Sequence, residues 1–259
     1  MRIGVCFKIV PDYETLLDEE WKKPAELDFT YAKKMYGCFD EPALEMALRI
    51  ADSLKAAGEE AETVAVTCGA PEGTVSDSLL RALFAAGFSD VVLLPASDSF
   101  SPALTAKSLA SYFSANPADL ILTGRMVGPG DSGMVPFYLA KELNLPLYPE
   151  MVSAKYETEK LQITCKEQDL LRVYTPDSPV LGTVGDAEAA YLRLFPLKAR
   201  MDAKKRVFSQ WEGVPAEDAG AVSLFCEEKP EGACRFLEAA DAADGARKLI
   251  EILKGGAEG

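Results

Sequence analysis

Short apolar runs alternate along the chain with longer segments in which apolar residues recur at intervals of three and four. The runs are IGVCFKIV (3–10), TVAVTCG (63–69), DVVLLPA (90–96) and DLILTG (119–124), all rich in Val, Ile and Leu. Between them lie DEPALEMALRIADSLKAAG (40–58), GTVSDSLLRALFAAG (73–87) and SPALTAKSLASYFSA (101–115), which have the period of amphipathic helices. This alternation predicts an α/β fold, a doubly wound, mostly parallel and Rossmann-like sheet with helices on both faces.

The pattern changes after a helix expected at about residues 132–143. The stretch MVSAKYETEKLQITCKEQDLLRVYTPDSPVLGTVGD (151–186) predicts shorter strands joined by polar turns, a partly antiparallel extension of the sheet. From residue 192 regular patterning is lost, and only DGARKLIEILKG (244–255) predicts a further helix, which ends at Gly255. We therefore expect an α/β domain over residues 1–206 and a C-terminal arm over 207–259, which folds back on the domain or docks on a partner.

A glycine-rich loop separates the fourth predicted strand from the helix that follows it. LILTGRMVGPGDSGMVPFYLAKELNLP (120–146) has glycines at 124, 128, 130 and 133, and places Asp131 and Ser132 where a helix N-cap is expected. The exposed amides at such a helix start suit a phosphate group. Any strand-to-helix turn needs similar residues, so a phosphate site and a plain capped helix both remain open.

The place of this loop in the sheet bears on that choice. Ligands of open α/β sheets bind beyond the carboxyl ends of the strands, where the strand order reverses. If the first strand neighbours the fourth, the segments CFKIVPDY (6–13) and GRMVGPGDSG (124–133) flank that crevice. The glycine loop would then lie at the usual binding position of the fold.

Composition excludes several classes of function. The chain has 259 residues, with 27 basic and 41 acidic side chains and a net charge of -14, which disfavours a nucleic-acid or anionic membrane partner. It contains no histidine, so Ser-His-Asp and Cys-His catalysis and histidine metal sites are excluded. We expect no catalytic residue of its own and no metal, with any chemistry supplied by a bound cofactor.

The cysteines favour a reduced, cytoplasmic protein. They are Cys6, Cys38, Cys68, Cys165, Cys226 and Cys234, and none forms a C-x-x-C pair. Cys6 and Cys68 lie in apolar runs, and we expect them to be unreactive core thiols. The N-terminal segment is too short for a signal peptide, and no run of about 18 apolar residues predicts a membrane span.

Five motifs in order resemble the β subunit of electron-transfer flavoproteins. They are GVCFKIVPD (4–12), YGCFDEPALEMALRIAD (36–52), VTCGAP (66–71) followed by LLRALFAAGFSD (79–90), PADLILTGRMVGPGDSGMVPFYLAKELNLP (117–146) and MDAKKR (201–206). Order and spacing match over about residues 1–206. The resemblance implies a Rossmann-like subunit, similar to adenine-nucleotide hydrolases in fold, that pairs with an α subunit carrying a redox-active FAD.

The resemblance also implies a nucleotide site in this chain, which holds AMP in ordinary members and a second, NADH-reduced FAD in bifurcating ones. Cys6 matches a position whose backbone contacts adenine, and Tyr13 an aromatic residue beside the flavin of the α subunit. The matched cofactor-contacting positions are Cys6, Tyr13, Gly37, Cys38, Phe39, Asp40, Cys68, Gly124, Arg125, Met126, Gly128, Gly130, Asp131, Ser132, Gly133, Met134 and Val135. Met126, Pro129 and Met134 replace polar residues of the family, so we expect weaker contacts to the nucleotide.

Partner recognition is implied near the end of the resemblance. Leu197 matches the anchor residue of the loop that recognises dehydrogenases such as acyl-CoA dehydrogenase, and Lys204 and Lys205 match the basic run after it. The implied function is an electron carrier, not an enzyme in its own right, that passes electrons from a dehydrogenase to an acceptor. NADH-dependent bifurcation stays open.

Two alternatives of other classes remain. GPGDSG (128–133) superficially resembles the S-G-G-x-D-S loop of ATP pyrophosphatases, which would make the chain an adenine-nucleotide-hydrolysing or adenylating enzyme. The loop of ATP pyrophosphatases follows the first strand, however, whereas GPGDSG follows the fourth. A stand-alone, homodimeric ATP-binding module of the stress-protein type would have the same fold. Such a module would not need the segment 192–206 or the arm.

Overall fold

The computed structural model describes residues 1–15, 32–68, 77–95, 101–126, 128, 132–177, 179–212 and 236–255. The chain divides into two compact units, Met1–Ser223 and Leu224–Gly259. The first contains the whole sheet, and the second contributes helix α7 (Ala242–Gly255). This helix lies where the sequence predicts it and ends at the expected glycine.

A nine-stranded sheet forms the centre of the first unit, in the order β11-β5-β4-β1-β6-β10-β7-β8-β9. Its strands are β1 (Arg2–Cys6), β4 (Glu62–Cys68), β5 (Asp90–Leu94), β6 (Leu120–Gly124), β7 (Leu147–Glu157), β8 (Lys160–Glu167), β9 (Leu170–Tyr174), β10 (Val180–Val184) and β11 (Ser209–Gln210). Pairing is parallel from β11 to β7, and β7, β8 and β9 pair antiparallel. The predicted α/β class and its antiparallel extension are confirmed.

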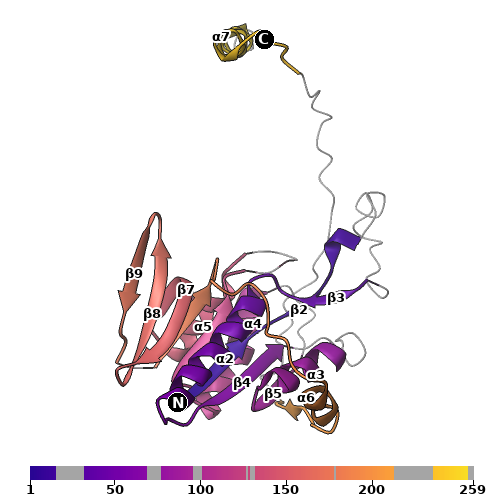
Figure 1. Ribbon diagram of the computed structural model, residues 1–259, viewed down its shortest axis with the longest axis vertical. Helices are drawn as coiled ribbons and strands as arrows, with labels where there is room; N and C mark the ends of the chain where they lie inside the picture. The colour runs from indigo at the N-terminus through magenta and orange to yellow at the C-terminus, as the bar shows by residue number, and fades with distance from the viewer. Residues whose placement is uncertain are drawn as a thin grey trace. The chain divides into compact units, whose positions relative to one another are not determined.

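Helices cover both faces of the parallel strands (Figure 1). Helices α2 (Asp40–Ala56) and α3 (Asp77–Ala86) pack on the face that carries Ile3, Val5 and Leu122. Helices α4 (Pro102–Ala115) and α5 (Val135–Leu143) pack on the face that carries Cys6 and Ile121. Successive strand residues thus enter different cores, which explains why these strands are apolar throughout.

The first apolar run is two strands, so the prediction of one strand over residues 3–10 was wrong. After β1 the chain leaves the main sheet, and β2 (Ile9–Pro11) pairs antiparallel with β3 (Lys34–Tyr36) in a separate two-stranded sheet. The break falls at Lys8, whose backbone amide donates a 2.9 Å hydrogen bond to Asp40 Oδ2. A carboxylate 32 residues away thus accepts from the backbone just past the end of β1.

Helix α5 begins later than expected, and its N-cap is not Asp131 or Ser132. The N-cap is Met134, which provides no side-chain cap. Ser132 Oγ instead accepts a 3.4 Å hydrogen bond from the amide of Met134, which tightens the loop before the helix. Asp131 and Gly130 lie outside the described residues.

Between residues 192 and 212 the chain forms two further regular elements, contrary to the prediction. Helix α6 (Leu197–Ala203) follows Pro196, and β11 pairs in parallel with β5 at one edge of the sheet. Arg81 of α3 holds both elements in place through hydrogen bonds from Nη1 to the carbonyl oxygens of Ala203, Lys204 and Arg206, at 3.3, 3.0 and 3.0 Å. Within the described residues, no helix combines the length and apolar character that a bilayer crossing requires.

Candidate functional site

The strand order reverses between β1 and β6, as the sequence predicts for the binding crevice. Cys6 lies beside Thr123 in the parallel register, so the chain after β1 and the chain after β6 leave the sheet next to each other. The N-terminus of α2 begins on one face of this point, and the loop into α5 lies on the other. Ligands of doubly wound sheets bind at such a switch point.

On the α5 side, a buried hydroxyl group has no hydrogen-bond partner among the described residues. Thr123 is 4% exposed, and its Oγ1 makes no such bond. Because Thr123 is two residues from Ile121, it points to the same face of the sheet, the face covered by α4 and α5. A buried polar atom without a hydrogen-bond partner destabilises the folded protein by about 1–3 kcal/mol. A ligand atom that hydrogen-bonds to Thr123 Oγ1 would remove this cost.

The loop before α5 requires glycine at its last turn. Gly133 has φ +61°, and a Cβ atom there would lie 3.1 Å from the carbonyl oxygen of Arg125. A side chain would therefore be strained in its backbone and crowded against the end of β6. Ser132 and Met134, on either side, are exposed. The predicted phosphate loop thus ends in a close approach between backbone segments at the start of α5.

On the α2 side, the carboxylate of Asp40 joins the two strand ends. Its Oδ2 accepts from the amide of Lys8, and its Oδ1 accepts a 3.1 Å hydrogen bond from the amide of Gly124. Asp40 is 5% exposed, and burial raises its pKa to about 7, while the two amides and the Lys8 ammonium act in the opposite direction. A Cβ atom on Gly124 would lie 2.3 Å from Asp40 Oδ1, so only glycine permits this contact.

Arg125 extends the cluster toward β7. Its guanidinium lies 4.2 Å from the centre of the Phe39 ring, and Nη1 is 3.2 Å from Glu150 Oε2. Its buried Nε has no partner among the described residues. Glu150 has φ +52° and donates its amide to Thr183 Oγ1 at 3.1 Å. A cation is therefore fixed beside the crevice by an aromatic ring and a carboxylate.

Most predicted site residues that the structure describes gather around this switch point. They lie at the ends of β1, β4 and β6, in the turn before α2 and in the loop into α5. These residues are Cys6, Cys68, Gly124, Arg125, Met126, Gly37, Cys38, Phe39, Asp40, Gly128, Ser132, Gly133, Met134 and Val135. Tyr13 lies in a short 3-10 helix, η1 (Tyr13–Thr15), and its side chain is outside the described part. Thr123 and Glu150 were missed, because only the strand register and the β7 bulge bring them to the site.

Comparisons with known proteins identify the family of this chain. A sequence profile of the electron transfer flavoprotein domain matches residues 37–215. The chain belongs to the electron transfer flavoprotein family. YgcR of Escherichia coli (strain K12), named as an electron transfer flavoprotein subunit, is 28% identical over 174 residues, which are 65% of this chain and 64% of YgcR. Subunit CarD of the caffeyl-CoA reductase-Etf complex of Acetobacterium woodii is 27% identical over 232 residues, 87% of this chain and 82% of CarD.

In this member of the electron transfer flavoprotein family, burial holds the thiols of Cys6 and Cys68 in their neutral form. Burial raises the pKa of Cys6 well above its ordinary value, with smaller contributions from Cys68 and Asp40. Burial also raises the pKa of Cys68 to about 12. A protonated thiol is a poor nucleophile and a poor metal ligand. In the described part of the chain, no cluster of three acidic or cysteine side chains could hold a metal ion.

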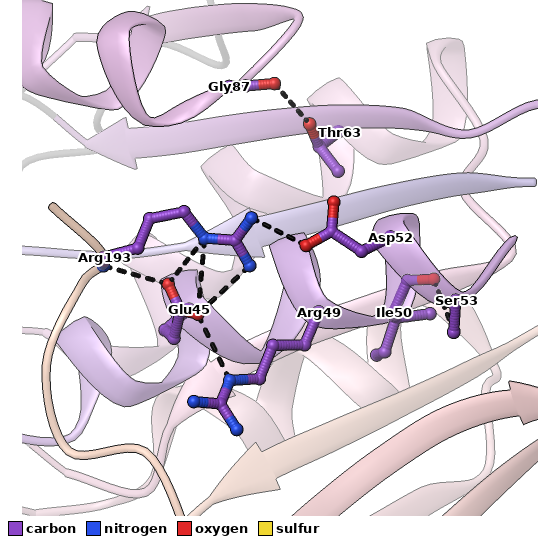
Figure 2. Close-up of polar contacts among 8 residues, drawn as sticks. All are labelled: Glu45, Arg49, Ile50, Asp52, Ser53, Thr63, Gly87 and Arg193. Atoms are coloured by element: carbon purple, nitrogen blue, oxygen red, sulfur yellow. Dashed lines mark hydrogen bonds and ion pairs between the residues drawn. The ribbon is translucent and has the colours of Figure 1, made fainter. Parts of the chain in front are cut away.

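The segment that resembles the family's recognition loop is fastened to α2. Figure 2 shows the Arg193 guanidinium between Glu45 and Asp52, with contacts of 3.1 Å to Glu45 Oε1 and 2.7 Å to Asp52 Oδ2. The amide of Arg193 also donates to Glu45 Oε2 at 3.0 Å. The Glu45 side chain is almost fully buried, so this ion pair is shielded from solvent. Sequence analysis missed it, because the partners are 148 residues apart.

Large apolar side chains project from this fastened segment. Leu194 is 100% exposed and Leu197, the predicted anchor residue, is 73% exposed. Tyr191, Met201 and Val207 are also exposed, and Lys204 and Lys205 follow at the end of α6. Loop backbone that is tied down while its apolar side chains face solvent is typical of a docking surface.

Proposed function

We propose that this chain is the β-type subunit of an electron-transfer flavoprotein. It pairs with an FAD-carrying α-type subunit, holds an adenine nucleotide at the β1/β6 switch point and docks on a dehydrogenase through the segment around Leu197. The bound flavin supplies the electron transfer, by accepting electrons from the dehydrogenase and releasing them to an acceptor. The chain itself then acts as a carrier subunit without a catalytic residue.

One observation carries the nucleotide site: the buried Thr123 hydroxyl without a described partner lies on the face covered by α4 and α5, at the end of β6. A phosphate group would be stabilised there, because the first amides of α5 follow the left-handed turn at Gly133 on the same side of the sheet. The partly exposed side chains of Met126 and Met134 are apolar, so the site is less polar than usual for the family.

The residues of this chain would bind and orient the nucleotide. Thr123 Oγ1 and Ser132 Oγ donate to phosphate oxygens, and the start of α5 offers amides and the positive end of its dipole. Cys6 and Cys68 line the adenine side as neutral thiols and carry no electrons. The switch point thus holds the nucleotide through hydrogen bonds and leaves electron transfer to the flavin.

Calorimetric titration with AMP, ADP and FAD, in the presence of an α-type subunit, tests the site. Replacement of Thr123 by valine should weaken binding about tenfold, because a buried hydrogen bond to an anion is lost. The control is Thr63→Val, a buried threonine at the far end of β4 whose hydroxyl donates to the carbonyl oxygen of Gly87. Absence of binding below millimolar nucleotide in the wild type would refute the nucleotide site.

A second candidate follows from the likeness to CarD. That protein is named as a subunit of the caffeyl-CoA reductase-Etf complex, and the match covers most of both chains. In this version the site holds FAD that accepts hydride from NADH, and the partner is a reductase. Reduction of bound FAD by NADH, followed at its visible absorbance, separates this candidate from an AMP-holding carrier.

A stand-alone ATP module or an adenine-nucleotide-hydrolysing enzyme is less well supported. The first strand is followed by Phe7 and Lys8 and the two-stranded sheet, not by the glycine loop of ATP pyrophosphatases. Neither class accounts for the ion pair between Arg193 and Glu45 beside the exposed Leu194 and Leu197. ATP turnover by the isolated chain would favour these alternatives.

A further inference from the structure

Asp40 is buried at the mouth of the crevice, where an ionised side chain is costly. Its carboxylate accepts hydrogen bonds from Lys8 and Gly124, the residues at which the chain leaves β1 and β6. Burial of a carboxylate destabilises the folded protein unless its oxygens are satisfied. An ionised carboxylate accepts on both oxygens, whereas an amide side chain accepts on one only. A carboxyl group therefore suits the two amides at this point better than an amide side chain would.

The backbone around Asp40 shows how fully this contact is built. The turn before α2 is closed by the amide of Asp40, which donates to the carbonyl oxygen of Gly37 at 2.9 Å. Gly37 in turn donates its amide to the carbonyl oxygen of Lys8 at 2.9 Å. Gly124 lacks the Cβ atom that would collide with Asp40. One carboxylate thus connects the start of α2 with both loops that flank the switch point.

We propose that Asp40 is a positioning residue of the nucleotide site: its carboxylate fixes the separation between the chain after β1 and the chain after β6. This inference rests on the proposed nucleotide site and extends it, because the resemblance assigned Asp40 only to a contacting loop. The adenine side and the phosphate side of the crevice belong to different strands. Their separation must be held within about 0.5 Å for both ends of one ligand to bind together.

The chain provides a matched control at the opposite end of the same two strands. Asp119 precedes β6 and its Oδ2 accepts a 2.6 Å hydrogen bond from the amide of Arg2, the first residue of β1. Asp119 is exposed and lies away from the crevice. Asparagine has one accepting oxygen, so it keeps the single hydrogen bond at Asp119 but loses one of the two at Asp40. The chemical change is the same at both positions, and only Asp40 borders the site.

The first measurement is AMP affinity at about pH 8, by calorimetry on the full chain with its α-type subunit. Asp40→Asn should raise the Kd about tenfold, and Asp119→Asn should leave it within about twofold. Equal affinity of the wild type and Asp40→Asn would overturn the proposal. If the wild type itself binds neither AMP nor FAD, the proposed function fails, and the role of Asp40 between the two strands is then decided by the second measurement.

The second measurement follows the backbone amide NMR signals of Lys8 and Gly124 in the wild type from about pH 5 to about pH 9. The groups facing Asp40 are the Lys8 ammonium, the Cys6 thiol of β1 and the Gly124 amide, with Arg125 next along the chain. Both amides should show one common transition near pH 7, which persists in Asp119→Asn and disappears in Asp40→Asn. Two unrelated transitions, or one retained in Asp40→Asn, would show that the carboxylate does not hold both strands. The wild-type titration answers this even if a variant folds poorly.

Discussion

At the scale of single residues, Gly124 is the tightest position of the site. A Cβ atom there would lie 2.3 Å from Asp40 Oδ1 and within 2.9 Å of the backbone at the start of α2. We expect Gly124→Ala to lower the free energy of unfolding by about 3 kcal/mol, because the backbone cannot move away cheaply. The control is Gly58→Ala, where φ is +81° and a Cβ atom would meet open space. The free energy of unfolding should fall there by only about 1 kcal/mol, because the strain is confined to the backbone. Denaturant unfolding gives both values, and equal losses would argue against crowding at the crevice.

The buried charge of Asp40 predicts an unusual pH dependence of stability. Its folded pKa of about 7 lies above the value of about 4 in an unfolded chain. Between these values the folded protein binds the extra proton, so the contribution of Asp40 to the free energy of unfolding falls as pH rises from about 4 to about 7 and is constant above. Denaturation of the wild type and Asp40→Asn across this range should show the difference. If the stability of the wild type relative to Asp40→Asn rose with pH over this range, the raised pKa of Asp40 would be contradicted.

The thiols of Cys6 and Cys68 are predicted to be chemically unreactive. Because burial raises the pKa of Cys6 and Cys68, neither forms a thiolate near neutral pH. Alkylation of the native protein, read by mass spectrometry, should modify the exposed Cys38 first and leave the other two intact until denaturant is added. Cys6→Val should leave electron transfer by the heterodimer nearly unchanged. A large loss would restore a thiol mechanism.

At the scale of elements, α6 and β11 depend on one arginine of another helix. Arg81 donates from Nη1 to three carbonyl oxygens around residue 204, and its guanidinium lies 5.1 Å from the Phe208 ring centre. Arg81→Ala should lower the free energy of unfolding by about 2 kcal/mol and speed amide exchange in α6 and β11. Lys55→Ala, on the exposed last turn of α2, is the control. Unchanged amide exchange in α6 would show that this helix is stable without Arg81.

The elements predicted from sequence are those whose own period identifies them. β4, β5, β6, α2, α4 and α7 follow from local apolar patterns, and the β1/β6 adjacency follows from the usual order of such folds. The end of β1 was missed because Asp40 defines it from a distance, and α6 because seven residues after a proline carry little periodic signal. The site was predictable as a glycine loop in the right place, but not Thr123, whose importance depends on strand register.

At the scale of the whole molecule, α7 has an apolar face that faces solvent in the described chain. Leu249, Ile250, Ile252 and Leu253 are all exposed. We expect this helix to dock on the α-type subunit, so Leu253→Asp should weaken the 1:1 heterodimer at least tenfold by light scattering and calorimetry. Glu251→Ser on the same helix should have little effect. If deletion of residues 213–259 leaves assembly intact, the arm is not an assembly element.

Helix α2 serves two places at once. Its first residue, Asp40, accepts hydrogen bonds from both sides of the crevice. Farther along, Glu45 and Asp52 form ion pairs with Arg193, in the segment that carries Leu194 and Leu197. If α2 moves as a rigid body, a shift caused by binding at the proposed nucleotide site also moves the proposed docking segment around Leu194 and Leu197. Thermodynamic reciprocity then makes this coupling equal in both directions. Whatever factor the nucleotide adds to dehydrogenase affinity, the dehydrogenase must add to nucleotide affinity.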